Sequence, residues 1–158
     1  MTWRYLTQED APAVLALCRS NPLYYRYLQE EPSLSGVLDG IFRPLPPGKT
    51  YADKFVTGFF ENGRLAAMMD LITGYPDAQT AFLGLFMVDA AFQGRGVGRK
   101  LVADVLAGLK EAGFSAVRLC RVRGNPQPEH FWALCGFRPT GLEIPQERYT
   151  VVVMEHTL

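Results

Sequence analysis

The feature that most constrains this chain is a glycine-rich turn between an apolar strand and an amphipathic helix. The turn is Gln93–Gly98, and the apolar run before it, Thr80–Val88, predicts a buried central strand. After the turn, apolar residues at helical spacing predict a helix that begins at Val97 and ends near Gly113. Glycines let backbone N–H groups converge on one point, and a helix N-terminus adds unpaired donors and partial positive charge. The turn is therefore expected to hold a pyrophosphate.

Two other kinds of phosphate-binding loop do not fit this turn. A P-loop requires glycine-lysine followed by serine or threonine, but Arg99 precedes Lys100 here and Leu101 has no hydroxyl for magnesium. A dinucleotide fingerprint requires its third glycine one position later than Gly98, after a first parallel strand. This turn follows an antiparallel meander in mid-chain, so both alternatives fail on spacing and context.

The remaining pattern predicts a mixed α/β fold with one domain over residues 1–158, because a chain of this length can bury one substantial core. Strands are expected over 3–6, 55–60, 65–73, 80–88 and 116–122, from residue 137 onward, and over 149–155. Helices are expected from the N-cap Thr7 to about Ser20, after Pro22, over 97–113 and over 127–135. A proline-rich loop, 43–48, and an Asn-Gly hairpin turn, 61–64, separate these elements.

Charge and composition narrow the class of ligand. The chain has no net charge, yet between Ala90 and Gly124 seven basic residues face only two acidic ones, Asp104 and Glu111. This local basic field suits a small polyanion better than a nucleic-acid backbone. No nucleic-acid partner is expected.

Cysteines, histidines and hydropathy argue against several other classes. The three cysteines, Cys18, Cys120 and Cys135, have no Cys-x-x-Cys spacing, and only two histidines are present, so neither a disulfide framework nor a metal site is expected. No apolar stretch is long enough to span a bilayer, and the N-terminus lacks the features of a secretion signal. We expect a cytoplasmic protein with no membrane partner.

Two motifs resemble those of the GNAT superfamily of N-acetyltransferases. Gln93, Gly96 and Gly98 fill its Gln/Arg-x-x-Gly-x-Gly/Ala pattern, and Asn125 followed by Phe131–Phe137 is similar to its second motif. The order of the predicted elements extends the resemblance over nearly the whole chain. It implies a central, mostly antiparallel twisted sheet that is splayed at the cofactor site, with helices on both faces. It also implies acetyl-CoA as co-substrate and no metal.

The resemblance assigns cofactor-binding roles along the middle of the chain. The pantetheine arm would pair with the backbone of Phe86, Met87 and Val88, while the strand 116–122 splays away. The pyrophosphate would lie on the backbone amides of Gln93, Gly94, Arg95, Gly96, Val97 and Gly98, with the Arg95 and Arg99 side chains available to phosphates. Asn125 would contact the pantetheine arm or serve only as a turn residue before Pro126. Trp132 would line the cofactor tunnel or belong to the core.

Two departures from the family pattern affect the acid–base chemistry. The family's common tyrosine acid falls at Trp132, and the strand 82–88 carries no glutamate. Asp70, flanked by methionines and aliphatic residues, is then the best candidate base, since an apolar strand makes a carboxylate unfavourable unless it has partners. An edge position, with the side chain in solvent or in a salt bridge, is the structural alternative for Asp70.

The acid and the acceptor pocket are less closely specified. Tyr75 is the leading candidate acid, with Tyr149 and His130 as alternatives, although packing or surface positions explain all three. Aromatic and acidic residues of the first half would suit a cationic amine: Tyr24, Tyr25, Asp53, Asp70 and Asp77.

The expected function is transfer of an acetyl group from acetyl-CoA to a primary amine of a small molecule or peptide, by direct attack on the thioester. A non-catalytic acyl-CoA-binding sensor and a protein-modifying acetyltransferase are the alternatives. A homodimer is left open.

Overall fold

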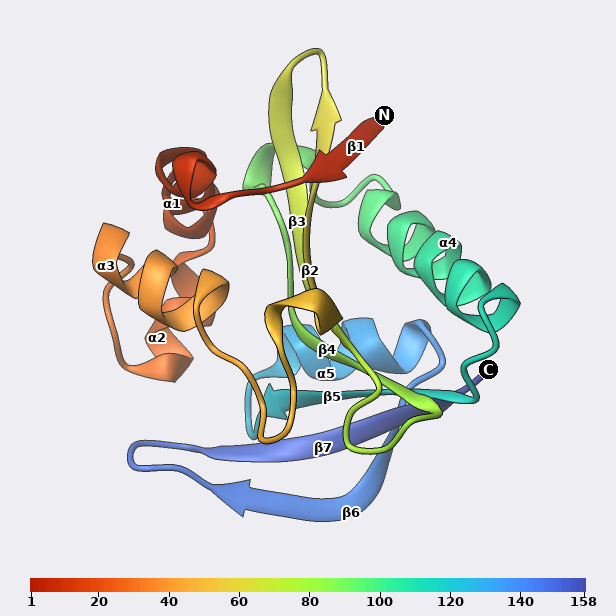
Figure 1. Ribbon diagram of the computed structural model, residues 1–158. Coiled ribbons are helices and arrows are strands. Elements are labelled where there is room, and N and C mark those ends of the chain that lie inside the picture. The colour runs from red at the N-terminus through yellow and green to blue at the C-terminus, as the bar shows by residue number, and fades with distance from the viewer.

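The computed structural model describes all 158 residues, and its centre is one seven-stranded sheet (Figure 1). The order across the sheet is β1-β2-β3-β4-β5-β7-β6, and every neighbouring pair is antiparallel except β4 with β5. The strands are β1 Thr2–Tyr5, β2 Lys54–Glu61, β3 Arg64–Thr73, β4 Thr80–Val88, β5 Ala116–Val122, β6 Arg138–Pro145 and β7 Thr150–Thr157. The predicted mixed, mostly antiparallel sheet is confirmed.

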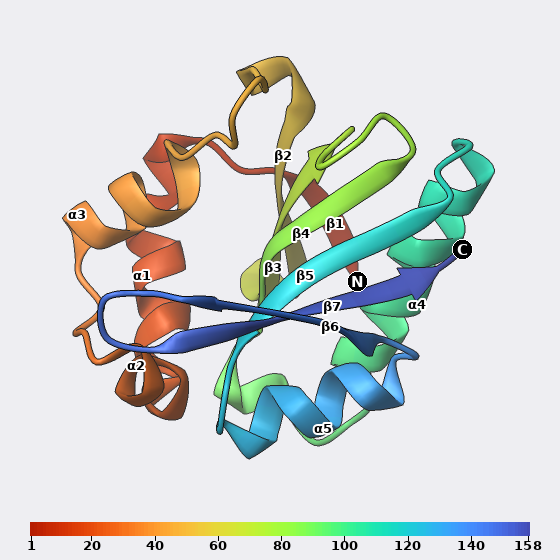
Figure 2. The same ribbon diagram turned by 90° about the horizontal axis from the view of Figure 1, so that it is seen from below.

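Helices cover both faces of the sheet, as predicted (Figures 1 and 2). One face carries α1 Ala11–Arg19, α2 Pro22–Leu28 and α3 Leu34–Val37, which continues into a π-helical turn over Leu38–Phe42. The other carries α4 Val97–Glu111 and α5 Pro126–Leu134. Short 3-10 turns lie at Gln8–Asp10, Tyr51–Asp53 and Ala90–Phe92.

Local sequence signals account for the boundaries of the N-terminal elements. Thr7 forms a capping box with Asp10, whose carboxylate accepts the Thr7 N–H at 2.8 Å. The chain turns from β2 to β3 at Asn62 and Gly63, whose φ angles of 51° and 77° fit a tight hairpin turn. Both predicted signals are confirmed.

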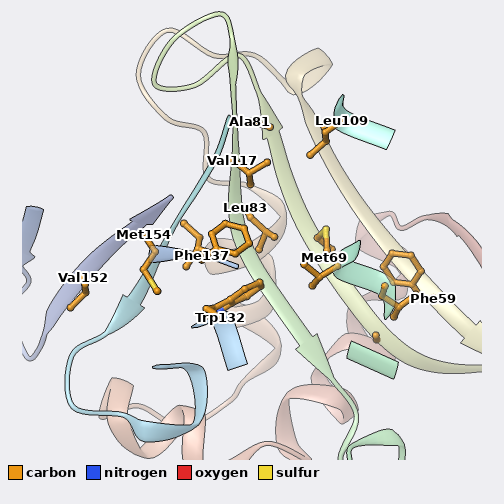
Figure 3. Packing of buried hydrophobic residues seen from close by; sticks show 14 residues of the cluster. Phe59, Met69, Ala81, Leu83, Leu109, Val117, Trp132, Phe137, Val152 and Met154 are labelled. Carbon is orange, nitrogen blue, oxygen red and sulfur yellow. The ribbon is translucent and has the colours of Figure 1, made fainter. Parts of the chain in front are cut away.

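Each face of the sheet has its own apolar cluster. On the α4–α5 face, Trp132 and Phe137 lie against Leu83 of β4 and Met154 of β7 (Figure 3). On the α1–α3 face, Val14 and Leu17 of α1 join Met68 of β3 and Met87 of β4. Successive strand residues therefore alternate between two buried clusters, which explains why β3 and β4 are apolar along most of their length.

The sheet opens between β4 and β5. The two strands pair in parallel only from Thr80 with Ala116 to Leu83 with Leu119, and they have no paired residues beyond that point. The register between β3 and β4 shifts there as well: Asp70 pairs with Leu85 and Leu71 with Leu83, so Gly84 is an extra residue on β4. The predicted splay is present, and its apex lies at Gly84.

Candidate active site

A pocket of about 350 Å³ occupies the space between the separated strands and the start of α4. It is lined by Asn21, Tyr24, Phe86, Met87, Val88, Gln93, Gly94, Gly96, Val97, Gly98, Arg99, Asn125, Gln127, Pro128, Phe131 and Trp132. All but one of the residues assigned to the cofactor from the sequence therefore lie around a single cavity. The exception is Arg95.

The glycines of the turn have geometries that other residues would not adopt easily. Gly94 and Gly96 both have φ near +77°, and a Cβ on either would meet no atom within 4 Å. Gly98 differs, because a Cβ there would lie 3.2 Å from the Phe131 ring and 3.4 Å from Val88. The first two glycines leave the backbone open to a ligand, while the third lets α4 approach the aromatic wall of the pocket.

Asn21 fastens this turn to the corner between α1 and α2. Its Nδ2 donates to the Val88 carbonyl at 3.0 Å, and its Oδ1 accepts from Gln93 Nε2 at 2.8 Å. Gln93 Nε2 also donates to the Val88 carbonyl at 2.8 Å, and Ser20 Oγ accepts the Ala90 N–H at 3.1 Å. Sequence reasoning missed Asn21, since its position before Pro22 indicated only the end of a helix.

The two arginines of the turn are placed differently. Arg95 folds back onto its own turn: Nη2 donates to the Ala91 carbonyl at 2.5 Å, and the guanidinium lies 5.6 Å from the centre of the Phe92 ring. Arg99 lines the pocket from the first turn of α4. Arg99 is thus the side-chain cation available to a phosphate inside the pocket.

Asn125 lines the opposite wall and is 1% exposed. Its Oδ1 accepts the Gln127 N–H at 3.2 Å and so caps the N-terminus of α5. The structural role considered for Asn125 is present, together with a position on the pocket wall.

Aromatic rings form the floor of the pocket. Trp132 is 7% exposed and lies 4.8 Å from Phe131 and 5.2 Å from Phe137 between ring centres. Phe86 stacks on Phe131 at 6.0 Å. Trp132 therefore belongs both to the pocket wall and to the core shown in Figure 3, which joins the two roles considered for it.

Asp70 lies outside the pocket lining, against Gly84 at the apex of the splay. A Cβ on Gly84 would be 2.9 Å from Asp70 Oδ2. Asp70 is 8% exposed and accepts two hydrogen bonds of 2.9 Å from Lys54 Nζ, whose side chain is 4% exposed. Burial raises the pKa of the Asp70 carboxyl, and the bonded Lys54 opposes that shift.

This placement corrects one expectation for Asp70. The strand β3 is interior to the sheet, so the edge position is wrong. The salt bridge that the same structural alternative allowed for Asp70 is present, with Lys54 as its partner. The partner Lys54 was missed because it lies on the neighbouring strand, where only the register brings it close.

The other candidate polar residues are spread out. Tyr75 lies in the β3–β4 turn and packs edge-on against Phe82 at 5.6 Å, outside the pocket lining. Asp77 accepts the Gln79 N–H and the Thr80 hydroxyl, both at 2.9 Å, and Asp53 accepts the Thr50 N–H at 3.0 Å. These two carboxylates hold turns.

Tyr24 is the aromatic residue of the N-terminal half that reaches the pocket. Burial raises the pKa of its hydroxyl, and the nearby Tyr149, Cys18 and Glu30 add to that shift. Its hydroxyl therefore keeps its proton at neutral pH.

No group of three or more histidine, cysteine or acidic side chains is arranged to hold a metal ion. All three cysteines are free thiols. None of the helices has the length and apolar character needed to cross a bilayer.

Comparisons with known proteins agree with this geometry. The model of the acetyltransferase (GNAT) family matches residues 17–137. A search of curated proteins finds no match. Among solved structures, an acetyltransferase from Thermus thermophilus superposes with a TM-score of 0.79 and 24% identity, covering 100% of this chain and 98% of that one.

Two further structures share the fold. The PaiA N-acetyltransferase from Thermoplasma acidophilum, in complex with coenzyme A, gives a TM-score of 0.71 and 20% identity, covering 99% of this chain and 98% of that one. The ribosomal-protein-S18-alanine N-acetyltransferase from Escherichia coli gives 0.71 and 18%, covering 99% and 92%. The match of the family model over residues 17–137, together with the two motifs and the splayed sheet, shows that this chain belongs to the GNAT family of acetyltransferases.

Proposed function

We propose that this protein transfers an acetyl group from acetyl-CoA to a primary amine of a small molecule or peptide. Residues 1–158 act in this proposal as one domain, because β1 and β7, near opposite ends of the chain, belong to the same sheet. The observation that carries the proposal is the alignment of three features. The glycine turn, the open edge of β4 and the buried Asp70 carboxylate follow one another along the splay.

The cofactor is proposed to run along β4 from the turn to the apex. Its pyrophosphate would accept hydrogen bonds from the N–H groups of Gly94–Gly98 and the start of α4. Arg99 would supply a positive charge beside it. The pantetheine arm would follow Phe86–Val88, whose edge toward β5 has no strand partner. The acetyl thioester then lies near Gly84.

The acceptor amine is proposed to reach the thioester from the α1–α3 face. On the α4–α5 face the apex is filled by Leu83, Leu119 and Trp132, all at most 7% exposed. On the opposite face Gly84 is exposed and carries no side chain. Asp70 lies on that face, because Met69 before it belongs to the α4–α5 cluster and side chains alternate along a strand.

Asp70 is the proposed general base. An ammonium cannot attack a carbonyl, and a carboxylate beside the thioester can accept its proton directly or through one water molecule. Burial that raises the pKa of Asp70 also makes it a stronger base. The free amine then attacks the carbonyl carbon, its nitrogen gives up a second proton as the carbon–sulfur bond breaks, and the coenzyme A thiolate leaves and takes a proton.

For that last proton, Tyr24 is better supported than Tyr75. Tyr24 lines the pocket along which the thiolate would leave. Tyr75 packs on Phe82, two residues before Gly84, so its hydroxyl would have to reach the sulfur from the far side of the apex. Replacing each tyrosine by phenylalanine distinguishes the two, because turnover should fall only when the tyrosine that acts as the acid is replaced.

Two observations favour the sensor alternative. Trp132 occupies the position of the family's common tyrosine acid, and Asp70 is held by Lys54. The deciding experiment incubates the protein with acetyl-CoA and a broad panel of primary amines, and measures released thiol. Amine-dependent release supports the enzyme. Tight binding of acetyl-CoA without release for any amine would support the sensor.

A further inference from the structure

Two segments far apart in sequence, the end of α2 and the β6–β7 loop, are hydrogen-bonded to each other on the α1–α3 face. Gln29 Nε2 donates to the Arg148 carbonyl at 2.8 Å, and Arg148 Nη1 donates to the Gln29 carbonyl at 2.7 Å. Arg148 Nη2 also lies 3.6 Å from Glu30 Oε2. We name this reciprocal contact between Gln29 and Arg148 the clasp. It joins the end of α2 to the β6–β7 loop, and the hairpin tip lies beside the N-terminal helices in both views (Figures 1 and 2).

The backbone on both sides of the clasp is held in place. Gln29 follows the last residue of α2 in the left-handed conformation, with φ 58° and ψ 42°, a region that favours glycine. The loop is closed by the Gln146 N–H, which donates to the Tyr149 carbonyl at 2.7 Å. The hydrogen bond from Gln29 Nε2 to the Arg148 carbonyl gives this side chain a partner at a position whose backbone suits glycine.

The clasp lies near the rim of the cofactor pocket, on the face from which the acceptor is proposed to approach Gly84. Tyr24, on α2 five residues before Gln29, lines the pocket, and Tyr149, next to Arg148, lies close enough to contribute to the raised pKa of Tyr24. Beyond the clasp, the Arg123 N–H donates to the Thr150 carbonyl at 2.8 Å, two residues before Asn125 of the pocket wall. The helix, the clasp and the hairpin therefore form a continuous rim on the acceptor side.

From this rim we infer the substrate class: the clasp restricts the acceptor to small primary amines and excludes extended peptides. This inference rests on the proposed function. A peptide whose N-terminal amine reaches the thioester must lead its remaining residues out between α2 and the β6–β7 loop, where Gln29 and Arg148 close the gap. A small amine needs no such exit.

The test uses two conjugates of coenzyme A, because their binding can be measured without knowing the natural acceptor. In both, the sulfur is joined through a –CH2–CO– bridge to the amine of alanine. In one conjugate the alanine is alanine amide, and in the other it is the N-terminal residue of a hexapeptide. Calorimetry measures each Kd with the parent and with the double variant Gln29→Gly/Arg148→Ala. Glycine suits the backbone of position 29, so the variant removes both side chains without disturbing the end of α2.

The parent is expected to bind the hexapeptide conjugate about tenfold more weakly than the alanine amide conjugate, and the double variant to reduce that ratio to about threefold or less. Arg138→Ala, on β6 of the same hairpin but outside the clasp, should leave the parent's ratio unchanged. Equal affinities in the parent, or the same ratio in parent and double variant, would overturn the clasp's role. If coenzyme A itself does not bind, the proposed function fails instead.

Discussion

Lys54 and Asp70 form a buried ion pair in which Lys54 Nζ lies 2.9 Å from each carboxylate oxygen. Asp70→Asn alone leaves a buried ammonium without its partner, and the free energy of unfolding should fall by about 3–5 kcal/mol. The double variant Asp70→Asn/Lys54→Met removes both charges and should recover most of that loss. Chemical denaturation of the three proteins measures the difference. Equal stability of the single and double variants would show that the pair carries no coupling.

The double variant also tests the proposed catalytic role of Asp70. If it folds like the parent, acetyl-CoA affinity should be unchanged while turnover falls by about 10²–10⁴, the usual contribution of a general base. Steady-state kinetics at saturating acetyl-CoA measures this. Unchanged turnover in the folded double variant would make Asp70 purely structural.

The pH profile provides an independent check on the base. Only the ionised carboxylate accepts a proton, and burial raises the pKa of Asp70 above 3.8, its value in unstructured peptides. For the parent, kcat/KM should therefore rise as the pH increases through that raised pKa. The double variant should lack this limb and gain rate only as free amine accumulates at higher pH. Identical acidic limbs in both proteins would assign the limb to another group.

Gly84→Ala tests the position of the carboxylate over the apex. The new Cβ would lie 2.9 Å from Asp70 Oδ2, so the carboxylate must move. Turnover should fall by about tenfold or more, with little change in acetyl-CoA affinity. Gly108→Ala is the matched control, because a Cβ there meets no atom within 4 Å and alanine favours the helix α4. If both variants keep the parent's turnover, the apex is not the reaction site.

Much of the fold was predictable from the sequence because its signals are local. The bounds of β4 and β5 were predicted to the residue, since each strand lies between turn residues. The capping box at Thr7 and the glycine turn likewise depend on residues a few positions apart.

The site's polar partners were not predictable, because they depend on strand register and helix placement. Lys54 reaches Asp70 from the adjacent strand, Asn21 reaches Val88 from 67 residues away, and Arg148 reaches Gln29 across 119 residues. No local pattern marks such pairs. Arg95 differs from these residues: it lies inside the predicted motif, but its side chain donates to the Ala91 carbonyl of the same loop and does not line the pocket.

Asn21→Ala tests one of these unpredicted contacts. It removes the hydrogen bonds to the Val88 carbonyl and to Gln93, so the Ser20 Oγ contact with the Ala90 N–H is the remaining one of these links between the turn and the α1–α2 corner. Acetyl-CoA should bind about tenfold more weakly, in line with the loss of one or two net hydrogen bonds. Asn62→Gly, in the β2–β3 turn, is the control and should bind like the parent. Equal affinity of Asn21→Ala and the parent would show that the turn holds its shape unaided.

The central claim is that the turn at Gly94–Gly98 holds acetyl-CoA, and a calorimetric titration of acetyl-CoA into three proteins tests it most directly. The parent should bind in the micromolar range, roughly 7–8 kcal/mol. Gly96→Asp places a carboxylate and a Cβ where phosphate would approach the backbone, and should abolish detectable binding. Gly48→Asp carries the same substitution at φ +78°, against +77° at Gly96, with no atom near either Cβ, so it controls for backbone strain and should bind like the parent. The absence of heat with folded parent protein, or equal affinity of Gly96→Asp and the parent, would contradict the account.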